Sequence, residues 1–198
     1  EALLNGLTIG IAKDDAFSFI YAANINLLEA MGATCVYFSP MADTLLPEVD
    51  ALWLPGGYPE LHHDALSANQ TMHQQLRAFH ASGKKILAEC GGMLYLMESL
   101  TDLVGQQTEM VGLLPGHGIM RERGGCQGMQ YAPLPEGEFR GHAHHRSRCE
   151  HQLEPIAFGR RISHLAPGEP IYQTGNLTAS YLHLYFPSNP QAIASLLR

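Results

Sequence analysis

The sequence predicts an α/β fold in which a parallel sheet is covered by helices on both faces. In the first hundred residues, short apolar runs alternate with segments of helical periodicity, and Gly or Pro stands at most of the boundaries. Strands that alternate with helices pair in parallel, because each helix returns the chain to the same end of the sheet. The length of 198 residues suits one core, so we expect a single domain over residues 1–198.

Four strands and three helices are expected before residue 105. The strands are the β-branched or apolar runs 7–11, 34–38, 51–54 and 86–88. The first helix is expected to follow an Asp14-Asp15 cap and to end at Gly32. The second is expected over 69–82 and the third over 93–100, since both carry apolar residues at helical spacing.

Beyond residue 105 the pattern changes to short antiparallel strands separated by Gly and Pro. The expected strands are 128–134, 156–164, 171–174 and 177–182. The last two flank Gly175-Asn176, a dipeptide that favours a two-residue hairpin turn. A closing helix is expected over 189–196, with Pro190 in its first turn.

Composition excludes several function classes. The net charge is −7 and the pI about 5.8, and Lys and Arg are scattered, which argues against nucleic acid or an anionic membrane as partner. No apolar run approaches the roughly 20 residues of a membrane span, and no signal peptide is visible. The cysteines are Cys35, Cys90, Cys126 and Cys149, with no CxxC pair, which favours a reduced cytoplasmic location. Because the chain begins at Glu1 and not at Met, a fragment of a longer protein is one interpretation.

The most informative segment is ILAECGGM, residues 86–93. An apolar strand ends, Cys90 follows, two glycines come next and a helix begins. This layout places a thiol on a tight strand-to-helix turn, where the helix dipole favours the thiolate and the Gly91 N–H can hold an oxyanion. Glu89 precedes the thiol. A role in the site and a purely structural role are equally good interpretations of this residue. A buried structural cysteine before a glycine turn is the alternative interpretation.

A second strand-to-loop segment ends in Pro55-Gly56-Gly57-Tyr58. In a parallel sheet this loop leaves the same carboxyl edge as the Cys90 turn, which is the edge where ligands bind. We expect the N–H of Gly57 or Tyr58 to complete an oxyanion hole, although a plain chain reversal explains the motif equally well.

A thiol nucleophile needs a base that is near in space and distant in sequence. His183, in the segment SYLHLYF, ends an expected strand and precedes a Pro/Asn turn, so we take it as the base. The alternative is a hydrogen-bonded histidine at a strand end.

Several longer stretches match a known family in its own order. They are AFSFIYAANINLLEAMGA, YFSPMADTLLP, LPGGYPELH, LAECGGMLYLMESL and SYLHLYFPSNP. These stretches resemble the C-terminal glutaminase domain of the cobyrinic acid a,c-diamide synthase family, a cobalamin-pathway branch of the class I glutamine amidotransferases. The resemblance covers nearly all of residues 7–197.

The resemblance implies a flavodoxin-like three-layer α/β/α domain with a mainly parallel sheet. It also implies that Cys90 attacks the amide of glutamine, that His183 is the base and proton donor, and that the Gly57 and Gly91 amides form the oxyanion hole. The family's synthetase domain, N-terminal or separate, uses ATP and Mg²⁺ to activate corrinoid carboxylates for amidation. No cofactor or metal is expected in this domain, which has no GxxxxGK[ST] loop.

Two segments depart from the family patterns. Many class I amidotransferases place Glu two residues after the histidine, where this chain has Tyr185. The family's GHEFHYS is GHAHHRS here, with Ala143, His144 and Arg146 at the changed positions. These departures leave two other hypotheses, a non-catalytic relative that binds a partner or ligand and a different cysteine hydrolase of the same fold.

Histidines near the second departure suggest a rival site. The side chains His142, His144, His145, Cys149 and His151 lie within ten residues and include zinc-ligand types. Their spacing matches no standard finger, so we favour surface histidines or a partner-contacting loop. His62-His63 is expected to open a helix near the site and to face solvent.

Overall fold

A computed structural model describes residues 2–125, 127–151 and 153–198, with only the backbone of residue 151. Cys126 and the side chain of His151 therefore lie outside the described residues. Within the described residues, no helix combines the length and apolar character that a membrane crossing requires.

The parallel half of the main sheet contains the four strands that the sequence predicts in the first hundred residues. In spatial order they are β2 (Thr34–Phe38), β1 (Thr8–Ala12), β3 (Ala51–Leu54) and β4 (Lys85–Glu89), followed by the later strand β13 (Leu177–Ser180). All neighbours in this series are parallel. The carboxyl ends of β3 and β4 therefore meet at one edge, as the sequence predicts.

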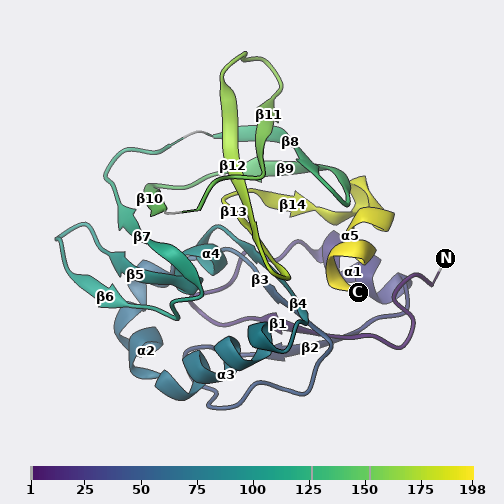
Figure 1. Ribbon diagram of the computed structural model, residues 1–198, viewed down its shortest axis with the longest axis horizontal. Helices are drawn as coiled ribbons and strands as arrows, with labels where there is room; N and C mark the ends of the chain where they lie inside the picture. Colours follow the sequence, from purple (N-terminus) through teal and green to yellow (C-terminus); the bar gives the residue numbers. More distant parts are fainter. Residues whose placement is uncertain (1, 126, 152) are drawn as a thin grey trace.

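Antiparallel strands extend the sheet beyond β13 (Figure 1). They are β12 (Pro167–Thr174), β11 (Ala157–Arg161), β8 (Gly128–Leu134), β9 (Gly137–Ala143) and β14 (His183–Tyr185). The hairpin at Gly175-Asn176 is confirmed, since Thr174 pairs with Leu177. The sequence led us to expect that His183 ends a strand, but this was wrong. His183 begins β14, which pairs with β9.

Helices cover both faces of the parallel half, which confirms the three-layer arrangement (Figure 1). Helices α1 (Ala22–Ala30) and α5 (Pro190–Leu197) lie on one face, and α2 (His63–Ala68), α3 (Gln70–Ala81) and α4 (Gly91–Leu96) lie on the other. Strand β3 shows the cause: Ala51 and Trp53 enter one core while Leu52 and Leu54 enter the other.

Two expected helices have the wrong extent. The first begins at Ala22, because the Asp14 carboxylate accepts the Ala16 and Phe17 N–H groups and closes a turn instead of a helix. The third ends at Leu96, and the next residues form a strand. In this fully buried apolar run, periodicity does not distinguish a helix from a strand.

That strand belongs to a second, smaller sheet that the sequence analysis missed. Its order is β10 (Ser147–His151), β7 (Leu114–Met120), β5 (Met97–Thr101) and β6 (Gln107–Glu109). It lies beside α4 and supplies part of the wall next to the strand-to-helix turn.

The helices 69–82 and 189–196 are confirmed as α3 and α5. Each begins after an asparagine whose side-chain oxygen accepts a backbone N–H: Asn69 from Met72 and Asn189 from Ala192.

Two buried polar side chains connect the parallel half to β14. The fully buried Asn24 of α1 donates to the Leu184 carbonyl at 2.9 Å and accepts the Phe186 N–H at 2.8 Å. The buried Glu89 carboxyl accepts the Trp53 Nε1–H and the Leu184 N–H, both at 2.7 Å. Burial raises the pKa of Glu89 to about 8, although both hydrogen bonds oppose this rise.

We predict that Asn24→Ala lowers the free energy of unfolding by about 2–4 kcal/mol, because it leaves one buried N–H and one buried C=O without their partner. Urea unfolding measures the change. The exposed Asn26 of the same helix is the matched control, and Asn26→Ala should change the free energy of unfolding by less than about 0.5 kcal/mol. An equal loss in both variants would contradict the importance of the Asn24 contacts.

A pH dependence of stability follows from Glu89. Its pKa is higher in the folded chain than its ordinary 4.5, so its contribution is fully present below pH 4.5 and is lost as pH rises through about 8. Unfolding measured from pH 5 to 8 should show this decline in the parent relative to Glu89→Gln, which has no proton to lose. Histidines titrate in both proteins and cancel in the difference. Parallel pH profiles of the two proteins would show that Glu89 does not titrate as described.

Candidate functional site

Cys90 occupies a strained turn between β4 and α4. Its φ is +47° and its ψ −108°, and it is the one non-glycine residue with positive φ in the described part of the chain. Such a conformation costs about 1–3 kcal/mol and persists only when its surroundings enforce it. Here the Cys90 N–H donates to the Ser180 carbonyl at 2.8 Å, and the Cys90 carbonyl accepts the Leu94 N–H at 3.0 Å. The turn thus holds the thiol at the sheet edge, as the sequence predicts.

The Cys90 thiol is buried and faces a carbonyl. Its Sγ lies 3.9 Å from the His144 carbonyl oxygen, to which it donates. Burial raises its pKa to about 12 and outweighs the lowering effect of the Gly91 N–H hydrogen bond. The sequence analysis expected thiolate character from the helix terminus, but desolvation has the larger effect in this structure. The resting group is a neutral thiol.

Two amides of the expected oxyanion hole lie beside one another. A Cβ added to Gly91 would be 3.0 Å from the Gly57 nitrogen, so only glycine permits this approach. Among the described residues, the Gly57 N–H has no hydrogen-bond acceptor, whereas the Tyr58 N–H donates to the Ala16 carbonyl at 3.0 Å. Gly57 is therefore the free donor of this loop. Tyr58 lines the cavity with its ring, which contacts Phe19 edge-on at 5.0 Å.

His183 lies buried against the same glycine loop. A Cβ on Gly56 would be 2.2 Å from the His183 Cε1, so the loop admits the imidazole only because residue 56 is glycine. Burial, together with smaller contributions from the neighbouring His142, His144 and His145, lowers the pKa of His183 to about 4. The imidazole is therefore neutral near pH 7 and able to accept a proton.

The thiol and the imidazole face two adjoining cavities. Cys90 lines a cavity of about 540 Å³, and His183 lines another of about 320 Å³. Phe19 and His144 line both. No hydrogen bond joins Cys90 to His183 in the described structure, because the thiol hydrogen is directed to His144. Hydrogen bonds between catalytic groups are often long before a substrate binds.

Glu89 does not line the thiol cavity. Its carboxyl accepts hydrogen bonds from the Trp53 side chain and from the backbone N–H of Leu184, the residue after His183. Glu89 therefore helps to position β14 through its backbone. Tyr185, which replaces the usual glutamate, is partly exposed and packs against Tyr21 with ring centroids 6.5 Å apart.

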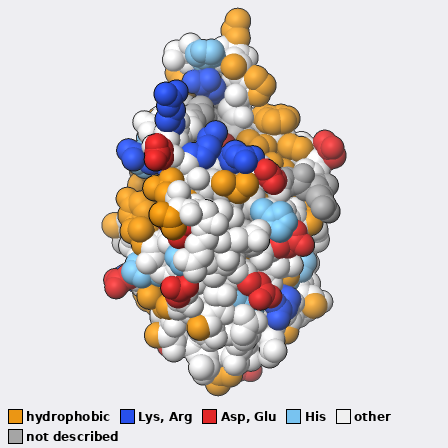
Figure 2. Space-filling view, turned by 90° about the vertical axis from the view of Figure 1, so that its left-hand side faces the viewer, with side chains coloured by type: hydrophobic (Ala, Val, Ile, Leu, Met, Phe, Trp, Pro, Cys, Tyr) orange, Lys and Arg blue, Asp and Glu red, His pale blue; other side chains and the backbone are white. Residues whose placement is uncertain are grey.

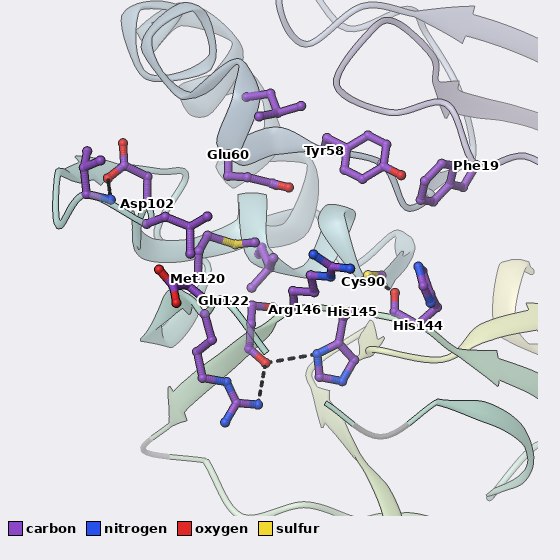
Figure 3. A pocket seen from close by; sticks show the side chains of 17 residues that line it. Phe19, Tyr58, Glu60, Cys90, Asp102, Met120, Glu122, His144, His145 and Arg146 are labelled. Carbon is purple, nitrogen blue, oxygen red and sulfur yellow. Dashed lines mark hydrogen bonds between the residues drawn. The ribbon is translucent and has the colours of Figure 1, made fainter. Parts of the chain in front are cut away.

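A buried polar network supports the wall formed by residues 144–147 (Figure 3). His145 Nε2 lies 2.7 Å from Glu169, its Nδ1 lies 3.0 Å from the Ser147 carbonyl, and its ring stacks on Tyr181 at 3.6 Å. The Tyr181 hydroxyl in turn lies 2.7 Å from the Ser147 hydroxyl. Sequence reasoning missed Glu169, which lies on β12 with no motif to mark it, and gave no role to Tyr181, which lies between β13 and β14 in the segment SYLHLYF.

The histidine cluster does not form a metal site in the described part of the chain. Among the described residues, which exclude the side chain of His151, no group of three or more His, Cys, Asp or Glu is placed to hold a metal ion. His63 begins α2 as expected, but it is not a solvent-facing histidine. Its Nδ1 lies 3.0 Å from the Thr108 hydroxyl, and its side chain is only 15% exposed.

Comparisons with known proteins identify the family and the fold of this chain. The chain is 52% identical over 196 residues to hydrogenobyrinate a,c-diamide synthase of Stutzerimonas stutzeri (strain A1501) and 48% identical to that of Pseudomonas aeruginosa. It spans 99% and 98% of its own length in these matches but only 46% and 45% of the relatives. A crystal structure of a glutamine amidotransferase superposes with a TM-score of 0.66 at 17% identity and covers 96% of each chain, which shows the shared fold. Residues 8–191 match the family model of the CobB/CobQ-like glutamine amidotransferase domain, and the chain therefore belongs to that family.

Proposed function

We propose that this chain hydrolyses glutamine to glutamate and ammonia through a thioester on Cys90, with His183 as base. One observation carries the proposal: Cys90 is held in a strained turn beside the unused Gly57 N–H. Backbone strain persists where the surrounding structure enforces it, and it clusters at active sites. A purely structural cysteine needs neither the strain nor an adjacent free donor.

The reaction follows from the properties of the two neutral groups. The thiol turns from the His144 carbonyl and passes its proton to His183 while the sulfur attacks the amide carbon of glutamine. The C=O electrons move to oxygen, and the Gly57 and Gly91 N–H groups hold this oxyanion, each contributing about 3–4 kcal/mol. The protonated His183 then gives its proton to the leaving nitrogen, and the C–N bond breaks to release ammonia.

Water completes the cycle. His183 takes a proton from water, the hydroxyl attacks the γ-glutamyl thioester, the C–S bond breaks to release glutamate, and the protonated His183 returns its proton to the sulfur to restore the thiol. Because burial keeps the imidazole pKa near 4, His183 is ready to act as base throughout the neutral range.

The relatives' names suggest the fate of the ammonia. Hydrogenobyrinate and cobyrinate a,c-diamide synthases are named for amidation of corrinoid carboxylates. This chain corresponds to less than half of each. We propose that its ammonia is used by a synthetase part, N-terminal or separate, which activates the corrinoid carboxylate with ATP and Mg²⁺. A cytoplasmic location is part of the same proposal.

One observation favours the second candidate, a non-catalytic relative that binds a partner or ligand. The thiol donates to the His144 carbonyl and not to His183, and burial opposes the ionisation of both groups. The third candidate, a cysteine hydrolase for other amides, predicts turnover of small amides or peptides with glutamine ignored.

We predict that Cys90→Ala abolishes glutamate release from glutamine and that His183→Ala lowers its rate about 10²–10⁴-fold. Glutamate is quantified by chromatography, with and without an added synthetase domain. The matched control is Cys35→Ala, which removes a half-buried thiol on β2 far along the sheet and should retain the parent rate. Equal glutamate release by the parent and Cys90→Ala, or none by the parent under either condition, would contradict the proposal.

A further inference from the structure

The thiol cavity carries charges of both signs on its walls. The charged lining residues are Glu60, Asp102, Glu122, Arg121 and Arg146. Two of them already have partners: Asp102 accepts the Val104 and Gln106 N–H groups, and Arg121 donates to the Ser147 carbonyl at 3.3 Å. The side chains of Glu122 and Arg146 make no ion pair or hydrogen bond with the described residues, and the Glu60 carboxylate has a hydrogen bond only with its own backbone N–H there.

Among the carboxylates, Glu60 has the largest electrostatic effect on the Cys90 thiol. It lies in the short helix η1 (Pro59–Leu61) directly after the Gly57 loop, and Pro59 packs within 2.9 Å of a Cβ added to Gly91. Among the charged groups that act on Cys90, Glu60 has the largest effect, and Glu122 is not one of them. Glu60 is also half-buried, and burial raises its pKa against the opposing hydrogen bond from its own N–H, so its charge lacks full hydration and has no cationic partner among the described residues. Such a group favours a cationic ligand.

Arg146 faces the same cavity from another wall. Figure 3 shows the Glu60 carboxylate and the Arg146 side chain on opposite sides of the opening beside Cys90. The backbone of Arg146 is fixed, because its carbonyl accepts the Arg121 N–H at 2.8 Å and its neighbours His145 and Ser147 belong to the buried network. The surrounding face also carries mixed charge: Lys and Arg gather in its upper half and Asp and Glu are spread over it (Figure 2).

We infer that Glu60 binds the α-ammonium of the amino-acid substrate and Arg146 its α-carboxylate, while the side-chain amide lies at Cys90. The inference rests on the proposed glutaminase function and names how its substrate is selected. A free α-amino acid is a zwitterion, and Glu60 and Arg146, which have opposite charges and no ionic partner among the described residues, match it. A peptide-linked glutamine has neither charge and is rejected.

The test measures protection of Cys90 from alkylation by iodoacetamide, followed on the Cys90 peptide by mass spectrometry. Three ligands are compared: L-glutamine, its deaminated analogue 4-carbamoylbutanoate, and glutaminamide, which has no α-carboxylate. Loss of one charge-assisted hydrogen bond weakens binding about 10–100-fold. The parent should therefore need at least tenfold more of either analogue than of glutamine for half-protection.

The variants assign each charge. Glu60→Gln should remove the preference for glutamine over the deaminated analogue and keep the preference over glutaminamide. Arg146→Tyr should remove the preference for glutamine over glutaminamide and keep the preference over the deaminated analogue. The control is Asp64→Asn, which removes an exposed carboxylate from neighbouring α2 and should leave both preferences unchanged.

The inference is overturned if the three ligands protect the parent equally or not at all, or if Glu60→Gln retains the preference for the ammonium group. These outcomes are separable from failure of the proposed function. Charge-selective protection without glutamate release would contradict the glutaminase function but would still support the binding inference.

Discussion

The buried carboxyl of Glu89 is the contact on which the site geometry depends. It lies at the end of β4, next to Cys90, the proposed nucleophile, and holds the Leu184 N–H next to His183, the proposed base. Trp53 of β3 fixes its other oxygen. The hydrogen bonds of Glu89 and Asn24 are the buried side-chain hydrogen bonds that connect β14 and the residue after it to the parallel half of the sheet in the described core. The distance between thiol and imidazole is thus set by core hydrogen bonds and not by a direct bond between them.

Dehydration sets the chemical state of the site. Burial raises the pKa of the Cys90 thiol and lowers that of the His183 imidazole, so both groups are neutral before substrate binds. A neutral pair avoids the cost of a buried ion pair, and the same dry surroundings strengthen the Gly57 and Gly91 hydrogen bonds to an oxyanion. The His144 carbonyl satisfies the thiol in the resting state, and binding of an amide must displace this contact.

Local signals predicted the reactive parts of the site but not their supports. The strand, the cysteine and the two glycines mark the turn in the sequence, and the parallel order of β3 and β4 follows from alternation, so Gly57 was predicted beside Cys90. Glu169, Tyr181 and the Leu184 contact of Glu89 depend on pairing between strands far apart in the chain, which no local pattern encodes. The predicted end of the helix over 93–100 was wrong for the same reason, since pairing with β7 makes residues 97–101 a strand.

Labelling of Cys90 by a diazo-ketone analogue of glutamine tests the central claim most directly. The reagent requires both a formed glutamine site and a nucleophilic thiol in it. The account predicts covalent modification of Cys90 that excess glutamine prevents and that is absent in Cys90→Ser. Labelling that glutamine does not slow, or modification of another cysteine in place of Cys90, would contradict it.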